Sequence, residues 1–156
     1  SIVFSRRTAI DPPVLPALFV NAWDGQGKRD YERVLERSFT WITAHDRDRL
    51  VGFVNIAWDG GVHFFLLDTT VDPAYQHRDI GTRLVTEAIE ACRGHGEWVH
   101  VDSSPELMDG FYGPAGFRPT SAGLAWVAVD DRVAPRADTA ERVTPGQGIE
   151  LGIAGH

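Results

Sequence analysis

Short apolar runs bounded by turn residues recur along the chain and predict strands at six places. The runs cover residues 2–8, 40–45, 50–58, 62–71, 98–101 and 124–129. The charged residues 46–49 form a turn between the second and third runs. Asp59-Gly60-Gly61 is a strong hairpin signal between the third and fourth runs. We therefore expect the central strands to pair antiparallel, with residues 2–8 as an edge strand.

Helix start signals and apolar spacing of three to four residues separate several of these runs. Asp11-Pro12 places an N-cap residue before a proline at the first helical position, and this helix is expected to end near Trp23. Residues 24–27, Asp-Gly-Gln-Gly, break it. Asp30 is placed to cap a second helix. Two further helices are predicted at residues 81–93, ended by Gly94, and at residues 107–112, ended by Gly113-Pro114.

The order of elements, β-α-α-β-β-β-α-β-α-β, is typical of an α+β domain. A strand reached through a helix usually runs parallel to the strand before it. We predict an α/β sandwich with a mixed, mostly antiparallel central sheet of about six to seven strands and helices on both faces. Residues 1–133 form the predicted domain. Residues 134–156 are rich in Pro, Gly, Ala and charge, and are expected to be a tail that is flexible or held by a partner.

Composition narrows the classes of protein. A chain of 156 residues suits one domain, and its net charge of −7 argues against general nucleic-acid binding, which needs a broad basic face. No stretch approaches the roughly 18 apolar residues of a membrane span. The single cysteine, Cys92, cannot form an internal disulfide and suits a reducing cytoplasm.

Residues 71–85, Val-Asp-Pro-Ala-Tyr-Gln-His-Arg-Asp-Ile-Gly-Thr-Arg-Leu-Val, carry the strongest chemical signal. They lead from an extended run through a proline-marked turn and a polar loop into the start of a helix. Unpaired N–H groups and the helix dipole make such a place suitable for phosphate. His77, Arg78 and Arg83 add a local basic cluster. Arg83 has an alternative role, because Glu87 lies one helical turn further on.

These residues resemble the phosphate-binding signature of the GNAT superfamily of acetyl-CoA-dependent N-acyltransferases. The signature runs Val-x-Pro-x-Tyr-Arg/Gln-x-x-Gly-x-Gly, and its positions are occupied by Val71, Pro73, Tyr75, Gln76, Asp79 and Gly81. A second family marker, a tyrosine shortly before Gly-Phe, is Tyr112 before Gly116-Phe117. One helix and one strand separate the two markers, as in the family. The resemblance covers about residues 2–129.

The resemblance implies a site for acetyl-CoA as acyl donor. The diphosphate would dock on the N–H groups of residues 76–81, and the pantetheine arm would lie beside residues 68–71. Asp79 stands where the family has its first loop glycine. Aspartate tolerates a positive φ, so we expect its side chain to turn outward while its N–H group still binds. The implied cofactor-binding residues are Thr69, Val71, Gln76, His77, Arg78, Asp79, Ile80, Gly81, Thr82 and Arg83.

Tyr112 is the expected acid, because its register before Gly116-Phe117 matches the family marker. Its weakly acidic phenol could protonate the departing CoA thiolate. The alternative is a core tyrosine beside Phe111 and Phe117.

A general base is also needed, because an alkylamine is almost fully protonated at pH 7. Asp68 and Asp102 are the main candidates, since they are expected near the ends of two adjacent strands, where clefts form. His63 and Glu106 are further candidates. Each of these residues has a solvated or capping role as its alternative, and Asp102 in particular could cap the helix that starts near Pro105.

Trp23, Trp41 and Trp58, together with Phe39, are candidates for lining an acceptor pocket, with plain core positions as the alternative. A separate set of side chains has the residue types of a metal site, namely Cys92, His95, His100 and Asp102. Cys92 lies on the buried stripe of its helix and His95 in the glycine turn. These side chains therefore need not converge, and no metal is expected.

Taken together, the sequence predicts an N-acetyltransferase that moves an acetyl group from acetyl-CoA to a primary amine of a small molecule or peptide. One alternative is a CoA-binding sensor or scaffold with little catalysis, and another is an enzyme that uses a longer acyl-CoA. The apolar late run and the tail are consistent with a homodimer. No nucleic-acid or membrane partner is expected, and the expected compartment is the cytoplasm.

Overall fold

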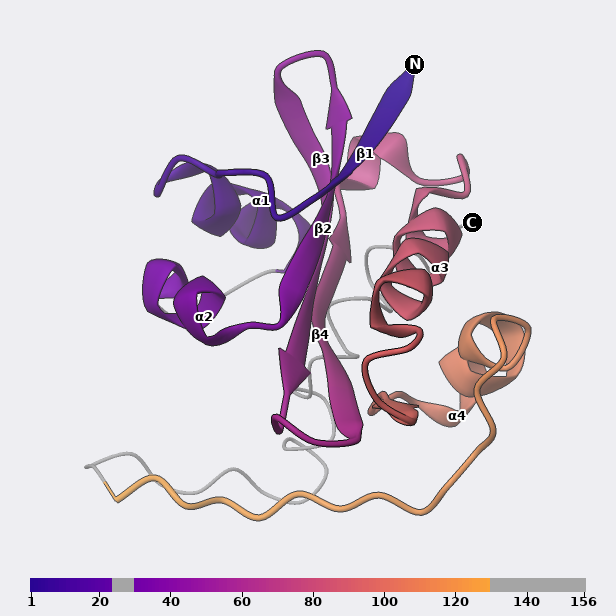
Figure 1. Cartoon of the computed structure of the whole chain (residues 1–156). Helices are drawn as coiled ribbons and strands as arrows, with labels where there is room; N and C mark the ends of the chain where they lie inside the picture. Colours follow the sequence, from indigo (N-terminus) through magenta and orange to yellow (C-terminus); the bar gives the residue numbers. More distant parts are fainter. Residues whose placement is uncertain (24–29, 130–156) are drawn as a thin grey trace.

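The computed structural model of the chain describes residues 1–23 and 30–129. Five strands form one sheet in the order β1-β2-β3-β4-β5 (Figure 1). The first four pair antiparallel, and β5 pairs parallel with β4, which confirms the mixed, mostly antiparallel α+β fold. The strand count is lower than the six to seven expected. The strands are β1 Ile2–Arg6, β2 Thr40–Asp46, β3 Arg49–Trp58, β4 His63–Val71 and β5 Trp98–His100.

Helices cover both faces of the sheet, as Figure 1 shows. One face is covered by α1 Val14–Ala22 and α2 Tyr31–Arg37, and the other by α3 Ile80–Cys92, which packs against β2, β3 and β4. A 3-10 turn, η1 Pro73–Tyr75, precedes α3, and α4 Pro105–Leu107 continues into a π-helical turn, η2 Met108–Tyr112. Within the described residues, no helix has the length and apolar character needed to cross a membrane.

The close approach of α3 to the sheet depends on a glycine. A Cβ on Gly52 of β3 would come within 3.1 Å of the side chains of Ile80 and Leu84. Glycine therefore lets the first turn of α3 lie directly on the sheet. The same interface contains Val54 and Leu84, both fully buried. Each such burial contributes about 1.5–3 kcal/mol, so the hydrophobic core fixes where the helix begins.

The helix starts on the first covered face agree with the prediction at α2 and differ at α1. Asp30 caps α2 as predicted, accepting from the N–H of Arg33 at 3.1 Å. By contrast, α1 begins at Val14 after Pro13, with no side-chain cap, rather than at Pro12. A proline disfavours helical geometry in the residue before it, so Pro13 delays the start. The predicted break at residues 24–27 and the tail at residues 134–156 lie outside the described residues.

The last helix begins at Pro105, the start considered with Asp102 as its cap, and two residues before the segment 107–112 predicted from apolar spacing. Ser104 is its N-cap and accepts from the N–H of Leu107 at 3.2 Å. Asp102 therefore does not cap this helix. Serine next to a proline at the first helical position is a favoured start, and this local signal outweighed the apolar spacing.

The strand predicted at residues 124–129 is absent. This segment pairs with no strand among the described residues, and the side chains of Leu124 and Val127 are 56% and 84% exposed. An apolar run specifies residues that suit a strand, but it does not specify a partner. The neighbouring β5 has only three residues and offers a short edge.

Candidate functional site

The parallel strands β4 and β5 diverge soon after they pair. The register runs from His63 opposite Trp98 to Phe65 opposite His100 and then stops, while β4 continues. A β-bulge bends β4 in its continuing part, where Asp68 has a φ of 56°. Bulges bend strands and are common beside functional sites. Beyond Phe65, β4 thus presents an edge unpaired by any described strand.

A cavity of about 1240 Å³ lies along this opening. Its volume exceeds the 300–1,000 Å³ typical of small-molecule pockets, so it has room for an extended arm and a second small molecule. Further along β4, the hydroxyl of Thr69 is buried and has no hydrogen-bond partner within the described residues, which leaves it able to bond a ligand. The lining includes Phe65, Leu67, His100, Asp102, Ser104 and Phe117.

The loop that follows β4 is held by Asp72. Its carboxylate is buried and accepts from the N–H of Ala74 at 2.9 Å and from Arg49 at 2.7 Å. The N–H of Asp72 donates to Val51 of β3 at 2.8 Å. A buried carboxylate with these partners fixes the direction in which the chain leaves the sheet.

Tyr75 fastens the same loop to the β2–β3 hairpin. Its hydroxyl donates to Asp46 at 2.6 Å, and this hydrogen bond lowers the pKa of Asp46 and raises the pKa of Tyr75. The guanidinium groups of Arg49 and Arg78 lie 5.5 and 4.9 Å from the centroid of the ring. The tyrosine of the signature therefore has an anchoring role.

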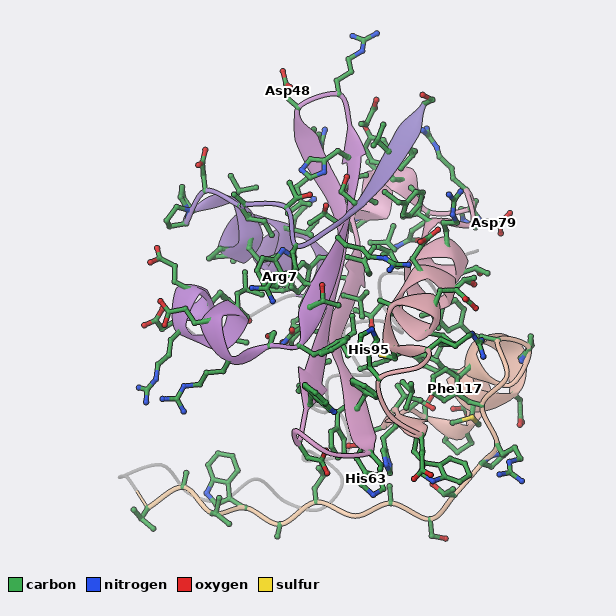
Figure 2. All side chains as sticks on the ribbon, viewed as in Figure 1. Arg7, Asp48, His63, Asp79, His95 and Phe117 are labelled. Carbon is green, nitrogen blue, oxygen red and sulfur yellow. The ribbon has the colours of Figure 1, made fainter. Side chains whose placement is uncertain are left out.

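Two residues of the loop have left-handed backbone conformations. His77 has a φ of 65° and Asp79 a φ of 57°. Asp79 occupies the N-cap of α3, makes no side-chain cap hydrogen bond, and points away from the molecule in Figure 2. The positive φ and outward side chain expected for Asp79 are present. The side chain of Asp79 thus does not cap the first turn of α3. The N–H groups of that turn can bind an external anion.

The basic residues near this loop differ in their contacts. Arg83 pairs with Glu87 at 3.2 Å and lies over the ring of Phe4, which is the alternative role foreseen for it. Such an exposed ion pair is weak, so a phosphate could displace Glu87. Arg78 is exposed beside Tyr75 and lies in the loop itself.

Tyr112 is fully buried at the end of a π-helical turn. The N–H of Gly113 donates to the carbonyl of Met108 at 2.6 Å, and a Cβ on Gly113 would lie 2.7 Å from that oxygen. Glycine after the tyrosine is therefore required by this turn. The ring of Tyr112 meets those of Phe111 and Phe117 edge-on, at 4.8 and 5.6 Å. π-Helical turns occur frequently at functional sites.

The carboxylate candidates lie where the strands part. Asp68 is 6% exposed at the bulge of β4, and Asp102 lines the cavity just beyond the end of β5. Their expected position near the ends of adjacent strands is confirmed. Glu106 is exposed on α4.

The three tryptophans are not brought together. Trp23 and Trp41 lie in the core beneath α1, with 4% and 8% of their surface exposed. Trp58 stacks on Phe64 at 5.6 Å on the opposite face of the sheet. None of them lines the cavity, and neither does Phe39, which packs against Trp58. The core alternative describes Trp23 and Trp41, whereas Trp58 is 39% exposed.

The side chains with metal-site residue types are separated. Cys92 is buried in the core, and this burial raises the pKa of its thiol to about 11. The ring of His95 packs near that of Phe39, at 5.4 Å. Across residues 1–23 and 30–129, no cluster of three or more metal-binding side chains is found.

A pair of histidines could not be recognised in the sequence. Nδ1 of His63 lies 2.7 Å from Nε2 of His100, and the ring of His100 stacks on Phe65. The sequence suggested His63 as a base on its own, and His100 only as a metal ligand. The single signal in the sequence is that each lies on a predicted strand, and the register between those strands is a property of the fold.

Comparison with known proteins supports the resemblance. Residues 12–117 match the profile described as Acetyltransferase (GNAT) family. The structure is similar to a GNAT family acetyltransferase from Streptococcus pneumoniae TIGR4, with a TM-score of 0.72 and 24% identity over 83% of this chain and 100% of that one. A search among curated proteins gave no match.

Two further structures share the fold at lower identity. One is glucosamine-6-phosphate N-acetyltransferase from Arabidopsis thaliana, with a TM-score of 0.63 and 15% identity over 80% of this chain and 98% of that one. The other is AAC(6')-Iy in complex with the bisubstrate analogue CoA-S-monomethyl-acetylneamine, with a TM-score of 0.65 and 16% identity over 83% and 99%.

Replacing Tyr75 by Phe should raise the pKa of Asp46 towards its ordinary value of 3.8. A carboxylate whose pKa is lower in the folded state stabilises the fold above its unfolded pKa, and this contribution is lost as pH falls through the folded value. Tyr75→Phe should thus destabilise the protein at pH 7 more than at pH 3. NMR titration of Asp46 and denaturant unfolding at both pH values test this.

The matched control is Asp46→Asn, in which adding Tyr75→Phe should cause no further pH-dependent loss. An Asp46 pKa that is the same in the native chain and in Tyr75→Phe would contradict the anchoring hydrogen bond.

Proposed function

This chain belongs to the GNAT family of acetyltransferases, and we propose that it transfers an acetyl group from acetyl-CoA to a primary amine of a small molecule or peptide. The observation that carries the proposal is the opening between β4 and β5, which adjoins a large cavity. The loop that leaves β4 leads directly to the uncapped start of α3. In this proposal the start of α3 takes a diphosphate, the free edge of β4 takes an extended arm, and the cavity takes an acceptor.

The donor half of the site is assigned to the chain's own backbone. N–H groups of residues 76–81 would hold the diphosphate, with Thr82, Arg78 and Arg83 beside it. Thr69 and Val71 would bond the pantetheine arm as an added strand does, since β4 is unpaired by a described strand there. When bound, acetyl-CoA supplies the thioester carbonyl that a neutral amine attacks directly. An N–H group of β4 could stabilise the developing oxyanion, an effect worth about 3–4 kcal/mol for one donor.

The acceptor is proposed to enter the cavity beside His100 and Asp102. Asp68 and Asp102 remain candidates for the base. Amino sugars are a reasonable first class of acceptor to test, because a fold neighbour is named as a glucosamine-6-phosphate N-acetyltransferase and another as an aminoglycoside acetyltransferase. The cytoplasm remains the proposed compartment, which cell fractionation would check.

Isothermal titration calorimetry with acetyl-CoA, followed by a thiol-release assay over a panel of primary amines, tests the proposal. We expect saturable binding and amine-dependent thiol release. Asp79→Gly should retain or tighten binding, because it removes a negative charge near the diphosphate and keeps a positive φ accessible. Asp48→Gly removes the same charge from the exposed β2–β3 turn and serves as the matched control (Figure 2).

Absence of acetyl-CoA binding would refute the proposal. Binding without thiol release from any amine would favour a CoA-binding sensor or scaffold. Faster release of CoA thiol from a longer acyl-CoA than from acetyl-CoA would identify a different donor. Weaker binding by Asp79→Gly would mean that the carboxylate has a positive role in the site.

We assign the role of acid to Tyr112, which would protonate the departing thiolate. Tyr112→Phe keeps the ring contacts with Phe111 and Phe117, so folding should be preserved. We expect kcat to fall tenfold or more, about 1.4 kcal/mol of barrier, with little change in affinity for acetyl-CoA. Steady-state kinetics across pH and calorimetry measure the two effects. Unchanged turnover at every pH would exclude the assignment.

A homodimer is proposed from two exposed apolar segments, β5 and residues 124–129. Trp98 is 53% exposed and Val127 84% exposed, and β5 forms the end of the described sheet. Two copies could cover these side chains by pairing residues 124–129 with the open edge. Light scattering should give about twice the chain mass of 17.2 kDa.

Val127→Glu should shift this equilibrium to the monomer. Val3→Glu, on the opposite edge strand, is the matched control, because Val3 is also exposed. A monomeric native chain would contradict the dimer, and a dimer that tolerates Val127→Glu would contradict this surface.

A further inference from the structure

Two histidines from parallel strands meet beside the cavity. His63 is the first residue of β4 and His100 the last of β5, and Nδ1 of the former lies 2.7 Å from Nε2 of the latter. In the parallel register His100 lies opposite Phe65, whose ring stacks on it with centroids 4.7 Å apart. The exposed imidazole of His100 thus lies against Phe65 at the point where the two strands part.

The two rings differ in their relation to the cavity. His100 lines the cavity, whereas His63 is not part of the lining. His100 is thus the ring at the cavity wall, where it is exposed, and His63 is half-buried at the start of β4. The carboxylates of Asp68 and Asp102 are the leading bases on sequence grounds. The tertiary structure adds a cavity-lining imidazole that has a second imidazole directly behind it.

A distance of 2.7 Å between two imidazole nitrogens requires a hydrogen bond with one proton between them. If Nε2 of His100 donates to Nδ1 of His63, the other nitrogen of His100 carries a free lone pair. That nitrogen, Nδ1, can accept a proton. The pair thus forms a base on the cavity side with a second proton acceptor behind it.

We propose that His100 and His63 form a proton relay that deprotonates the acceptor amine; this inference rests on the proposed acetyl transfer. Nδ1 of His100 takes the proton from the ammonium group, and Nε2 of His100 passes its own proton to Nδ1 of His63. His63 then releases the proton on its Nε2 to water. The amine keeps its electron pair for attack on the thioester, and both rings finish neutral in the opposite tautomer. His100 is the catalytic base, and His63 is a positioning residue.

Charged groups around the pair have opposite signs. Asp59, in the β3–β4 turn, accepts from the backbone N–H of His63 at 3.2 Å and interacts electrostatically with its ring. Asp102 follows β5 in the cavity wall, and Arg93 and Arg118 line the same cavity.

The relay is tested with His100→Gln and His63→Gln, using acetyl-CoA and the best primary alkylamine from the acceptor panel. A positioned base contributes about 100-fold or more, so His100→Gln should lower kcat about 100-fold at pH 7. It should also remove the fall in rate between pH 8 and pH 5, the range in which histidine gains a proton. His63→Gln should cause a smaller loss of kcat, about tenfold, and shift the pH at which the rate falls.

His95→Gln is the matched control, because His95 is exposed, packs near Phe39 and does not line the cavity. It should leave the rate and the pH profile unchanged. All three variants should keep the melting temperature and the affinity for acetyl-CoA measured by calorimetry. With an arylamine, which is already neutral at pH 7, the loss in His100→Gln should be much smaller than with the alkylamine.

NMR titration of the imidazole protons, without any substrate, gives a readout besides activity. The two rings should titrate as a coupled pair in the native chain, and His100 should titrate singly in His63→Gln. Independent titration in the native chain overturns the relay.

The kinetic outcomes separate the relay from the acetyl transfer on which it rests. If the native chain releases thiol but His100→Gln keeps the native pH profile, the relay is wrong and the transfer stands. If the native chain releases no thiol with any amine, the transfer itself is refuted, and the relay with it. An equal loss with the alkylamine and the arylamine also overturns the base role.

Discussion

The parting of β4 and β5 is the constraint on which the site depends. Parallel pairing lasts for three residue pairs, from His63 opposite Trp98 to Phe65 opposite His100. The bulge at Asp68 then bends β4, and no described strand takes up its hydrogen-bonding groups on that side. Unsatisfied backbone groups beside a large cavity are costly unless water or a ligand binds them. The fold thus builds a binding edge by leaving a sheet incomplete.

The loop at the end of β4 is rigid for a different reason. Asp72 and Tyr75 attach it to β3 and to the β2–β3 hairpin, while Gly52 lets the first turn of α3 rest on the sheet. The loop is therefore held from the protein side, at residues that precede the start of α3. Asp79 adopts the left-handed conformation without capping the helix, so an aspartate can take the place of the family's glycine.

The proposed acceptor side lies in another part of the molecule, at the cavity beside β5. The structural neighbours share this fold at only 15–24% identity, so side chains beyond the shared framework differ widely. In this chain the cavity wall near the divergence carries His100, stacked on Phe65 and bonded to His63. In the proposed assignment, the backbone of β4 and α3 binds the donor, whereas side chains of β4 and β5 face the acceptor.

The sequence by itself determined the features that arise within a few residues of one another. The hairpin at Asp59-Gly60-Gly61, the cap at Asp30 and the left-handed backbone at Asp79 were all predictable, because turns and caps depend on short-range sterics and hydrogen bonds. The α+β order and the loop of residues 71–85 followed from the same local signals. Much of the donor side of the candidate site could therefore be predicted.

Only the tertiary structure decided which distant residues meet. His63 and His100 are 37 residues apart and touch because α3 returns β5 to β4 in one register. Trp41 and Trp58, which looked alike in the sequence, lie on opposite faces of the sheet, and residues 124–129 have a strand-like pattern without a described partner. Local patterns set what each segment can form, but strand register and sheet order set its neighbours. Those follow from the packing of the whole domain.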